Sequence, residues 1–180
     1  MTRFSEMLAS LRARRRRGGA RFSPSSPARV GQFYDATHDK FLQVYGEVIQ
    51  AFRTKDVTKL LDYQIESIGF AAGQHVLDAG CGVCGPAIYF SKKTGVTVEG
   101  LTVSRAQADD ARRRIRDAGL EEEVQVREGS YQDLPALYPA ESFDAVYFLE
   151  SFGHSDDQER TIKAAWHVLK PGGTLYIKDL

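Results

Sequence analysis

The chain lacks long hydrophobic runs and has few cysteines, and each absence removes a class of protein. No apolar stretch among its 180 residues approaches the roughly 20 residues that a membrane-spanning helix needs, so we predict no membrane span. It has two cysteines, Cys81 and Cys84, whereas a secreted domain built on disulfides needs more of them, spread along the chain. No apolar segment of signal-peptide type stands near the N-terminus. We therefore expect a cytoplasmic protein.

The net charge is also zero, but this value conceals a strong asymmetry. Residues 1–30 hold eight basic residues and one acidic residue, while the rest of the chain holds 16 basic and 23 acidic residues. An acidic body exerts no long-range attraction on phosphate groups, so we predict no nucleic-acid partner. The arginine run at 14–17 and the Ser/Pro stretch at 23–27 cannot bury a core, and we predict a disordered tail. A transit peptide or a basic patch for anionic partners is the alternative.

Beyond this tail, a helical segment precedes an alternation of strands and helices. Apolar residues recur at helical spacing from Phe41 through Phe52, which predicts one helix from Phe33 onward, and a second helix is predicted over 57–68. Short apolar strands then alternate with helices, which indicates a parallel sheet with helices on both faces. The expected strands are 75–78, 96–100, 124–128, 145–149 and 174–178, and the expected helices between them are 86–93, 105–118 and 156–169.

This order of elements predicts an α/β fold with a Rossmann-like, doubly wound parallel sheet preceded by N-terminal helices. We assign residues 1–30 to the tail, 31–70 to a helical lid and 71–180 to the ligand-binding domain. Because the sequence stops on the fifth strand, we expect the C-terminal part of the usual fold to be missing.

A glycine-rich turn links the first strand to the first helix of the sheet. It reads Asp-Ala-Gly-Cys-Gly-Val-Cys-Gly over residues 78–85. Glycines let the backbone approach a ligand closely, and the helix start offers free N–H groups and the positive end of a dipole. This spacing alone also fits NAD-binding domains. Asp78, however, would repel a pyrophosphate and attract an ammonium group.

Three later segments accompany this loop in a fixed order, at 129–133 after strand three, 142–146 before strand four and 169–175 before strand five. With them, residues 31–180 resemble the class I S-adenosylmethionine-dependent methyltransferases. The resemblance implies S-adenosylmethionine as the cofactor. It assigns cofactor binding in the first loop to Asp78, Gly80, Cys81 and Gly82.

At one position the sequence departs from the usual pattern of this family, and the departure indicates a smaller group within it. Where most of the family carries an acid after strand two, this chain has Thr102, within a Gly-Leu-Thr-Val-Ser run that Gln107 follows. That pattern is similar to the cyclopropane fatty acid synthases and the sterol and tocopherol C-methyltransferases. It implies that Thr102, Val103 and Gln107 serve the cofactor.

Two further segments extend the cofactor site that the resemblance implies. A Phe-Tyr-Asp run at 33–35 resembles the entry segment of these enzymes, whose tyrosine, here Tyr34, closes over the cofactor. Ser130 and Tyr131 match the loop that flanks the adenine. Tyr34 is equally compatible with a packing role.

Candidate catalytic residues follow strand four, in the run Leu-Glu-Ser-Phe-Gly-His-Ser-Asp over 149–156. Ligands of open α/β sheets bind beyond the carboxyl ends of the strands, so Glu150 and His154 stand where an acceptor should come. The sterol and tocopherol enzymes show a similar run. Glu150 would stabilise a developing cation or accept a proton, and His154 would act as the base. A lone histidine near a helix start is also commonly structural.

We therefore predict methyl transfer from S-adenosylmethionine to a small, apolar acceptor that is isoprenoid, sterol-like or otherwise lipid-like, with an amine or phenol as further options. We predict no metal, because no second Cys or His pair completes a zinc site with Cys81 and Cys84. An NAD-dependent oxidoreductase, with Glu99 on the ribose, would use the same loop but leaves the later segments unexplained. A truncated, non-catalytic cofactor-binding module is the other alternative. The sequence does not define the oligomeric state.

Overall fold

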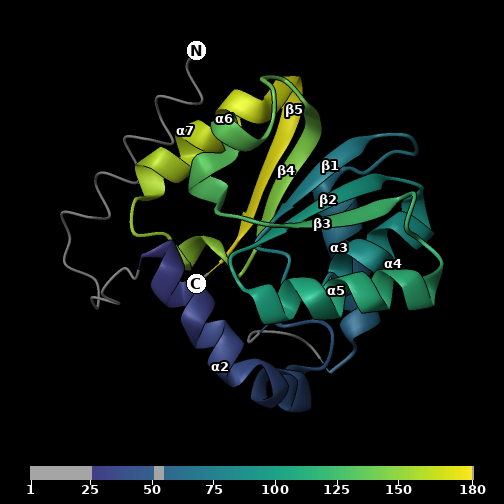
Figure 1. Ribbon diagram of the computed structural model, residues 1–180. Helices are drawn as coiled ribbons and strands as arrows, with labels where there is room; N and C mark the ends of the chain where they lie inside the picture. Colours follow the sequence, from purple (N-terminus) through teal and green to yellow (C-terminus); the bar gives the residue numbers. More distant parts are fainter. Residues whose placement is uncertain (1–25, 51–54, 180) are drawn as a thin grey trace.

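The computed structural model describes residues 26–50 and 55–179, in which a parallel β-sheet lies between two layers of helices (Figure 1). The strand order is β3-β2-β1-β4-β5, and every neighbouring pair is parallel. The chain starts at the centre, winds outward to β3 and returns beside β1, which confirms the predicted doubly wound sheet. The strands are β1 (His75–Ala79), β2 (Thr97–Thr102), β3 (Val124–Glu128), β4 (Phe143–Leu149) and β5 (Leu169–Lys178).

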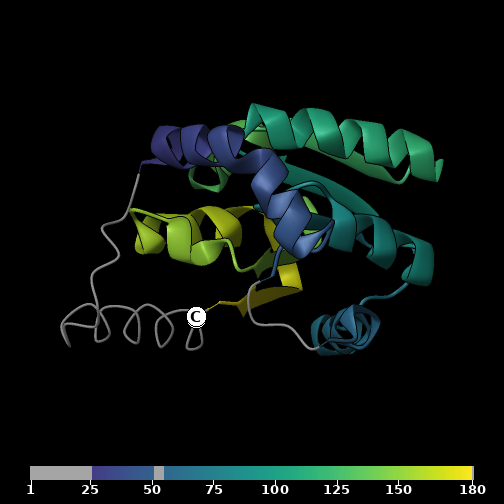
Figure 2. The same cartoon turned by 90° about the horizontal axis from the view of Figure 1, so that it is seen from below.

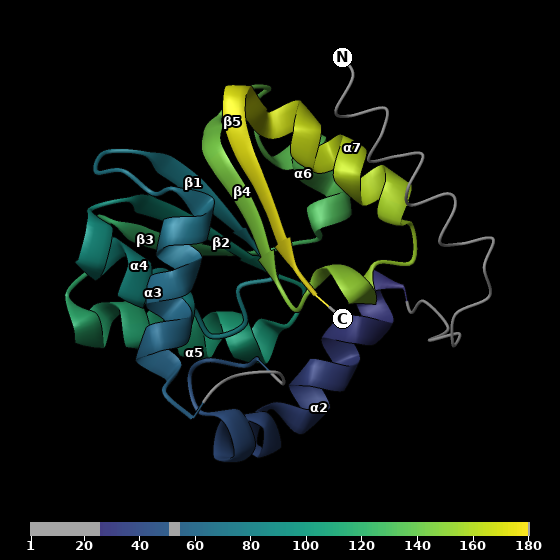
Figure 3. The same ribbon diagram turned by 180° about the vertical axis from the view of Figure 1, so that it is seen from behind.

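Helices bury both faces of this sheet, α3, α4 and α5 on one side and α6 and α7 on the other (Figure 1, Figure 3). Successive residues of a strand point to opposite faces, so Val76 joins the core under α3, α4 and α5 while Leu77 joins the core under α6 and α7. The helices are α3 (Val57–Ile68), α4 (Gly85–Thr94), α5 (Arg105–Ala118), α6 (Leu134–Leu137) and α7 (Gln158–Val168), with single 3-10 turns η1 (Tyr131–Asp133) and η2 (Phe152–His154).

Local sequence signals explain where α3 and α5 begin and end. The side chains of Asp56 and Ser104 accept hydrogen bonds from backbone N–H groups in the first turns of α3 and α5. Gly69 and Gly119 follow the last turns in the left-handed conformation that suits glycine. Both helices match their predicted bounds, and the other predicted elements from α4 to α7 agree within two residues.

Helix α2 (Pro27–Tyr45) lies beyond the carboxyl ends of the strands, beside the start of α5 (Figure 2, Figure 3). The prediction that this helix continues to Phe52 is wrong over the described residues. Gly46 adopts a φ of 65° and ends the helix, and the backbone then turns inward through residues 47–50. Val48 therefore packs into the core from a turn. Phe52 lies outside the described residues.

The segment Pro171-Gly172-Gly173, predicted as a turn before the last strand, lies within β5 instead. Phe143 pairs with Leu169 and the next pair joins Ala145 to Thr174, so these three residues, together with Lys170, bulge out of the ladder. Most of the predicted tail, residues 1–25, lies outside the described residues. The predictions that the tail extends to residue 30 and that the helix starts at Phe33 are wrong, because α2 begins at Pro27, a residue suited to the first turn of a helix. No helix in the described part of the chain combines the length and apolarity that crossing a membrane requires.

Candidate active site

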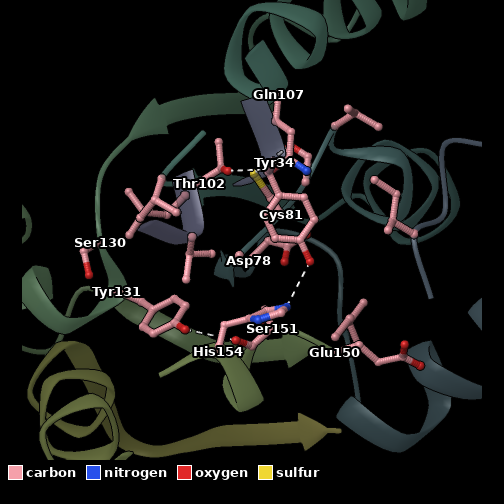
Figure 4. A pocket seen from close by; sticks show the side chains of 18 of the residues that line it. Tyr34, Asp78, Cys81, Thr102, Gln107, Ser130, Tyr131, Glu150, Ser151 and His154 are labelled. Carbon is pink, nitrogen blue, oxygen red and sulfur yellow. Dashed lines mark hydrogen bonds between the residues drawn. The ribbon is translucent and has the colours of Figure 1, made fainter. Parts of the chain in front are cut away.

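A cavity opens at the carboxyl ends of the strands, around the switch point between β1 and β4 (Figure 4). Its walls come from α2, the glycine loop after β1, the start of α5, the loop after β3 and the segment after β4. Every site residue that the sequence predicts lines this cavity. They are Tyr34, Asp78, Gly80, Cys81, Gly82, Thr102, Val103, Gln107, Ser130, Tyr131, Glu150 and His154.

The glycine loop is anchored on β2 and shaped by two of its glycines. The N–H groups of Gly80 and Cys81 both donate to the Leu101 carbonyl, at 2.8 and 3.0 Å. Gly80 has a φ of 98°, and a Cβ there would lie 2.3 Å from the Cβ of Ser151. A Cβ on Gly82 would meet only the Ile49 side chain, at 3.6 Å. The loop backbone is therefore tightly packed at Gly80 and has room for a ligand at Gly82.

Asp78 places a buried carboxyl group at the base of the cavity. The residue is 1% exposed, and its Oδ2 atom has no hydrogen-bond partner in the described residues. Burial raises the pKa of Asp78 to about 7, and the nearby Tyr147 hydroxyl opposes this rise in part. Tyr147 lies opposite Asp78 on β4, and among the described residues its hydroxyl also lacks a partner at hydrogen-bonding geometry. A cationic ligand group would satisfy this carboxylate, as the ammonium of an amino-acid cofactor does.

Thr102 and Gln107 are bonded to each other at the start of α5. The Thr102 hydroxyl donates to Oε1 of Gln107 at 2.9 Å, and the N–H of Ser104 donates to the same hydroxyl at 3.2 Å. The amide oxygen of Gln107 is thereby used within the protein. Val103, between them, meets α2 so closely that a Cβ on Gly31 would lie 2.4 Å from its carbonyl oxygen.

Tyr34 and His154, 120 residues apart in sequence, meet across the cavity (Figure 4). The Tyr34 hydroxyl lies 2.9 Å from Nε2 of His154, and the two rings pack edge to face. Burial, reinforced by the negative charges of Asp179 and Glu150, raises the pKa of Tyr34 to about 12. The phenol therefore keeps its proton near neutral pH and donates it to Nε2 whenever that nitrogen is unprotonated.

Glu150 occupies a left-handed backbone position directly after β4, with a φ of 58°. Its carboxylate forms an ion pair with Lys178 at the end of β5. Figure 4 shows this carboxylate pointing away from Tyr34 and His154. The pairing reduces the charge that Glu150 can offer to a developing cation in the cavity.

Ser130 and Tyr131 form the wall after β3. Ser130 accepts a hydrogen bond from the Gln132 N–H at 3.1 Å, and the Tyr131 hydroxyl donates to the Ser151 carbonyl at 3.0 Å. Burial raises the pKa of Tyr131 above its ordinary value, with Asp179 adding to the effect. Tyr131 therefore lines the cavity with an uncharged ring, whose hydroxyl is fixed by the Ser151 carbonyl.

The two cysteines of the loop are free and buried. A Cβ on Gly100 would lie 2.9 Å from both Sγ atoms, which places the two thiols side by side against β2. A hydrogen bond with Cys84 and then burial raise the pKa of Cys81 well above its usual value. The Cys81 thiol therefore stays protonated and unreactive. Within the described residues, no group of three or more His, Cys, Asp or Glu side chains is arranged to hold a metal.

Sequence reasoning missed part of the lining, above all the turn after α2 and Ser151. Ile49 and Gln50 reach the cavity from this turn, which a buried amide pair holds in place: Gln64 Nε2 donates to Gln50 Oε1 at 2.8 Å. Ser151 donates to the Ala79 carbonyl at 2.5 Å, behind Gly80. Gly46 is the one sequence signal that marks the turn, as a helix stop.

Comparison with known proteins identifies the family. A family model described as a methyltransferase domain matches residues 77–177. The methyltransferase GfsG of Streptomyces halstedii is 33% identical over 161 residues, which cover 84% of this chain and 57% of that protein. The 27-O-demethylrifamycin SV methyltransferase of Amycolatopsis mediterranei is 33% identical over 162 residues, covering 86% and 59%. A sterol 24-C-methyltransferase of Aspergillus fumigatus is 38% identical over 117 residues, covering 65% and 30%.

Solved structures share this fold. The cyclase SpnF superposes with a TM-score of 0.80 at 28% identity, covering 86% of this chain and 60% of that one. A geranyl diphosphate methyltransferase in complex with S-adenosylmethionine gives a TM-score of 0.60 at 27% identity, covering 66% and 48%. The chain thus spans about three fifths or less of the length of these relatives. Oδ2 of Asp78, which has no hydrogen-bond partner among the described residues, fits a cationic cofactor group at the base of the cavity. The chain belongs to the family of S-adenosylmethionine-dependent methyltransferases, and S-adenosylmethionine is its cofactor.

Proposed function

We propose that this protein transfers the methyl group of S-adenosylmethionine to a small, apolar acceptor of isoprenoid, sterol-like or other lipid-like type. The observation that carries this proposal is the cavity itself, with an unpaired carboxylate at its base and the Tyr34–His154 pair across it. Similarity to the sterol and geranyl diphosphate methyltransferases supports an apolar acceptor. The family match does not support an NAD-dependent oxidoreductase. The free cysteines are compatible with a reducing, cytoplasmic location, which we include in the proposal.

In this proposal the protein binds the cofactor through residues that line the cavity. Asp78 would pair with the ammonium group, and the backbone from Gly80 to Gly82 would lie along the methionine part. Thr102, Val103 and Gln107 line the cavity at the start of α5, and they would also bind the cofactor. Ser130 and Tyr131 would flank the adenine. The sulfonium supplies an already activated methyl group, so this chain contributes alignment of the acceptor and exclusion of water.

His154 would accept the proton that leaves the acceptor. In this role His154 would carry its own proton on Nε2 and donate it to the Tyr34 oxygen, so that Nδ1 is the nitrogen free to accept the proton of the acceptor. Glu150 is less well placed for this role because Lys178 already pairs with its carboxylate. A general base is needed where the nucleophile must lose a proton before transfer, as with a phenol, or where a proton must leave the cation that forms when a carbon is methylated.

The proposal is tested by incubating the chain with S-adenosylmethionine labelled on its methyl group and four acceptors: geranyl diphosphate, a sterol, a simple phenol and a primary amine. We expect label in the product of an apolar acceptor. Transfer to the amine alone would overturn the acceptor class. No transfer to any acceptor, from a chain that binds the cofactor, would favour the non-catalytic module. The outcome without transfer has to be considered because the similar structure SpnF is named a cyclase, and a shared fold does not determine the reaction.

Replacing His154 by alanine is expected to lower the rate of transfer by about 100-fold, the lower range for loss of a general base. Affinity for S-adenosylhomocysteine should stay within about threefold of the wild type, because His154 acts on the acceptor side. His167→Ala, at an exposed histidine of α7, is the matched control and should leave both quantities unchanged. An unchanged rate in His154→Ala would remove the base role from this residue.

A further inference from the structure

One carboxylate outside the cavity fastens helix α2 to the start of α5. Oδ1 of Asp35 accepts hydrogen bonds from the Ser104 hydroxyl at 2.6 Å and from the Ala106 N–H at 3.1 Å. Asp35 does not line the cavity. Its charge lies at the N-terminus of α5, where the helix dipole and the free N–H groups favour an anion. These contacts join segments that are about 70 residues apart in the sequence.

Ser104, whose hydroxyl is bonded to Asp35, orients two residues that line the cavity. Ser104 accepts from the Gln107 N–H at 3.2 Å and donates its own N–H to the Thr102 hydroxyl at 3.2 Å. Thr102 in turn donates to the side chain of Gln107 at 2.9 Å. Ser104 therefore links Asp35 to both Thr102 and Gln107 through single hydrogen bonds. A shift of Ser104 would change the direction of both lining side chains.

Asp35 itself belongs to α2, the helix that covers the cavity. Its neighbour Tyr34 lines the cavity and bonds to His154, and Gly31 one turn earlier packs directly on the Val103 carbonyl. One turn later, His38 lies 3.4 Å from the buried carboxylate of Asp110 on α5. Figure 2 shows α2 next to the start of α5. The same helix thus contacts α5 and covers the cavity.

We infer that Asp35 is a positioning residue, a latch that docks α2 on the turn from Thr102 to Gln107 and so couples closure of the cavity to cofactor binding. The inference rests on the proposed assignment of Thr102 and Gln107 to the cofactor. Closed α2 places Tyr34 over the cavity and fixes Ser104 in the same event. Release of Asp35 frees both at once, so the bound cofactor leaves faster.

The test compares Asp35→Ala and Asp35→Asn with Asp39→Ala, at an exposed carboxylate on the same helix. Calorimetry and stopped-flow measure the affinity and the dissociation rate of S-adenosylhomocysteine. Asp35→Ala should weaken binding by about tenfold, mainly through faster dissociation, because two hydrogen bonds to a charged group are lost. Asp35→Asn keeps an accepting oxygen and should stay within about threefold of the wild type. Asp39→Ala should bind as the wild type does.

Amide hydrogen exchange in the cofactor-free protein supplies an independent readout. The amides of Ala106 and Gln107 should exchange faster in Asp35→Ala, while amides of the central strands keep their protection. Wild-type affinity in Asp35→Ala, equal weakening in Asp39→Ala, or unchanged exchange at Ala106 and Gln107 would each overturn the latch. If the wild-type chain does not bind S-adenosylhomocysteine, the cofactor assignments fail, and the exchange measurement still decides whether Asp35 holds this turn.

Discussion

Replacing Asp78 by asparagine is expected to stabilise the cofactor-free protein above pH 7. Burial raises the pKa of Asp78 in the folded state to about 7, above the ordinary value of 3.8. Because the folded pKa is the higher one, the charged form opposes folding, and stability falls as pH rises through the window between these two values. The asparagine side chain has no such dependence. Wild type and variant should be equally stable near pH 4, and the variant should be more stable by on the order of 4 kcal/mol above pH 7.

The same substitution should weaken binding of S-adenosylhomocysteine by about 100-fold at pH 8, since it removes the anion that pairs with the ligand ammonium in a buried site. Denaturant unfolding between pH 4 and 8, with calorimetric titration, measures both effects. Asp39→Asn, at an exposed carboxylate, is the control for the loss of a negative charge. A destabilised Asp78→Asn variant, or one that binds as well as the wild type, would show that Asp78 is a structural residue.

Gly80→Ala is expected to destabilise the protein by about 3 kcal/mol or more and to abolish cofactor binding. The new Cβ would lie 2.3 Å from the Cβ of Ser151, at a residue whose φ is 98°. The matched control is Gly119→Ala, because Gly119 also has a positive φ, 66°, but has open space around its Cβ position. The control reports backbone strain alone, about 1 kcal/mol, and should leave binding intact.

A second change separates steric overlap from strain at Gly80. Ser151→Gly removes the Cβ that the new methyl group would meet, so the Gly80→Ala, Ser151→Gly double variant should recover part of the lost stability. Denaturant unfolding of the four proteins of this cycle provides the coupling energy. Additive effects of the two substitutions would contradict the contact between the glycine loop and the segment after β4.

The sequence predicts the sheet well because its information is local. Apolar strands alternate with helices whose starts and stops are marked by residues such as Ser104 and Gly119, and the structure confirms these bounds. It fails at the end of α2 because apolar residues continue at helical spacing past Gly46. Val48 packs in the core and Ile49 lines the cavity, and both residues do so from a turn. The spacing of apolar residues does not distinguish such a turn from the buried face of a helix.

The sequence indicates the residues of the candidate site one at a time, mostly through family resemblance, but it does not indicate the interactions between them. Tyr34 and His154 are each recognisable in the sequence, but the hydrogen bond between them joins residues 120 positions apart. The pairing of Glu150 with Lys178 depends on the register between β4 and β5, which places Leu149 opposite Lys178. Long-range pairing of this kind follows from the folded chain, and spacing along the sequence carries no signal for it.

The most direct test of the cofactor site is calorimetric titration of the wild-type chain with S-adenosylhomocysteine and, separately, with NADH. We expect micromolar binding of S-adenosylhomocysteine and no heat with NADH. The affinity should fall by about tenfold per pH unit below pH 7, as Asp78 takes up its proton. Heat with NADH alone, or no binding of S-adenosylhomocysteine by a folded chain at any pH, would contradict a methyltransferase cofactor site built on Asp78.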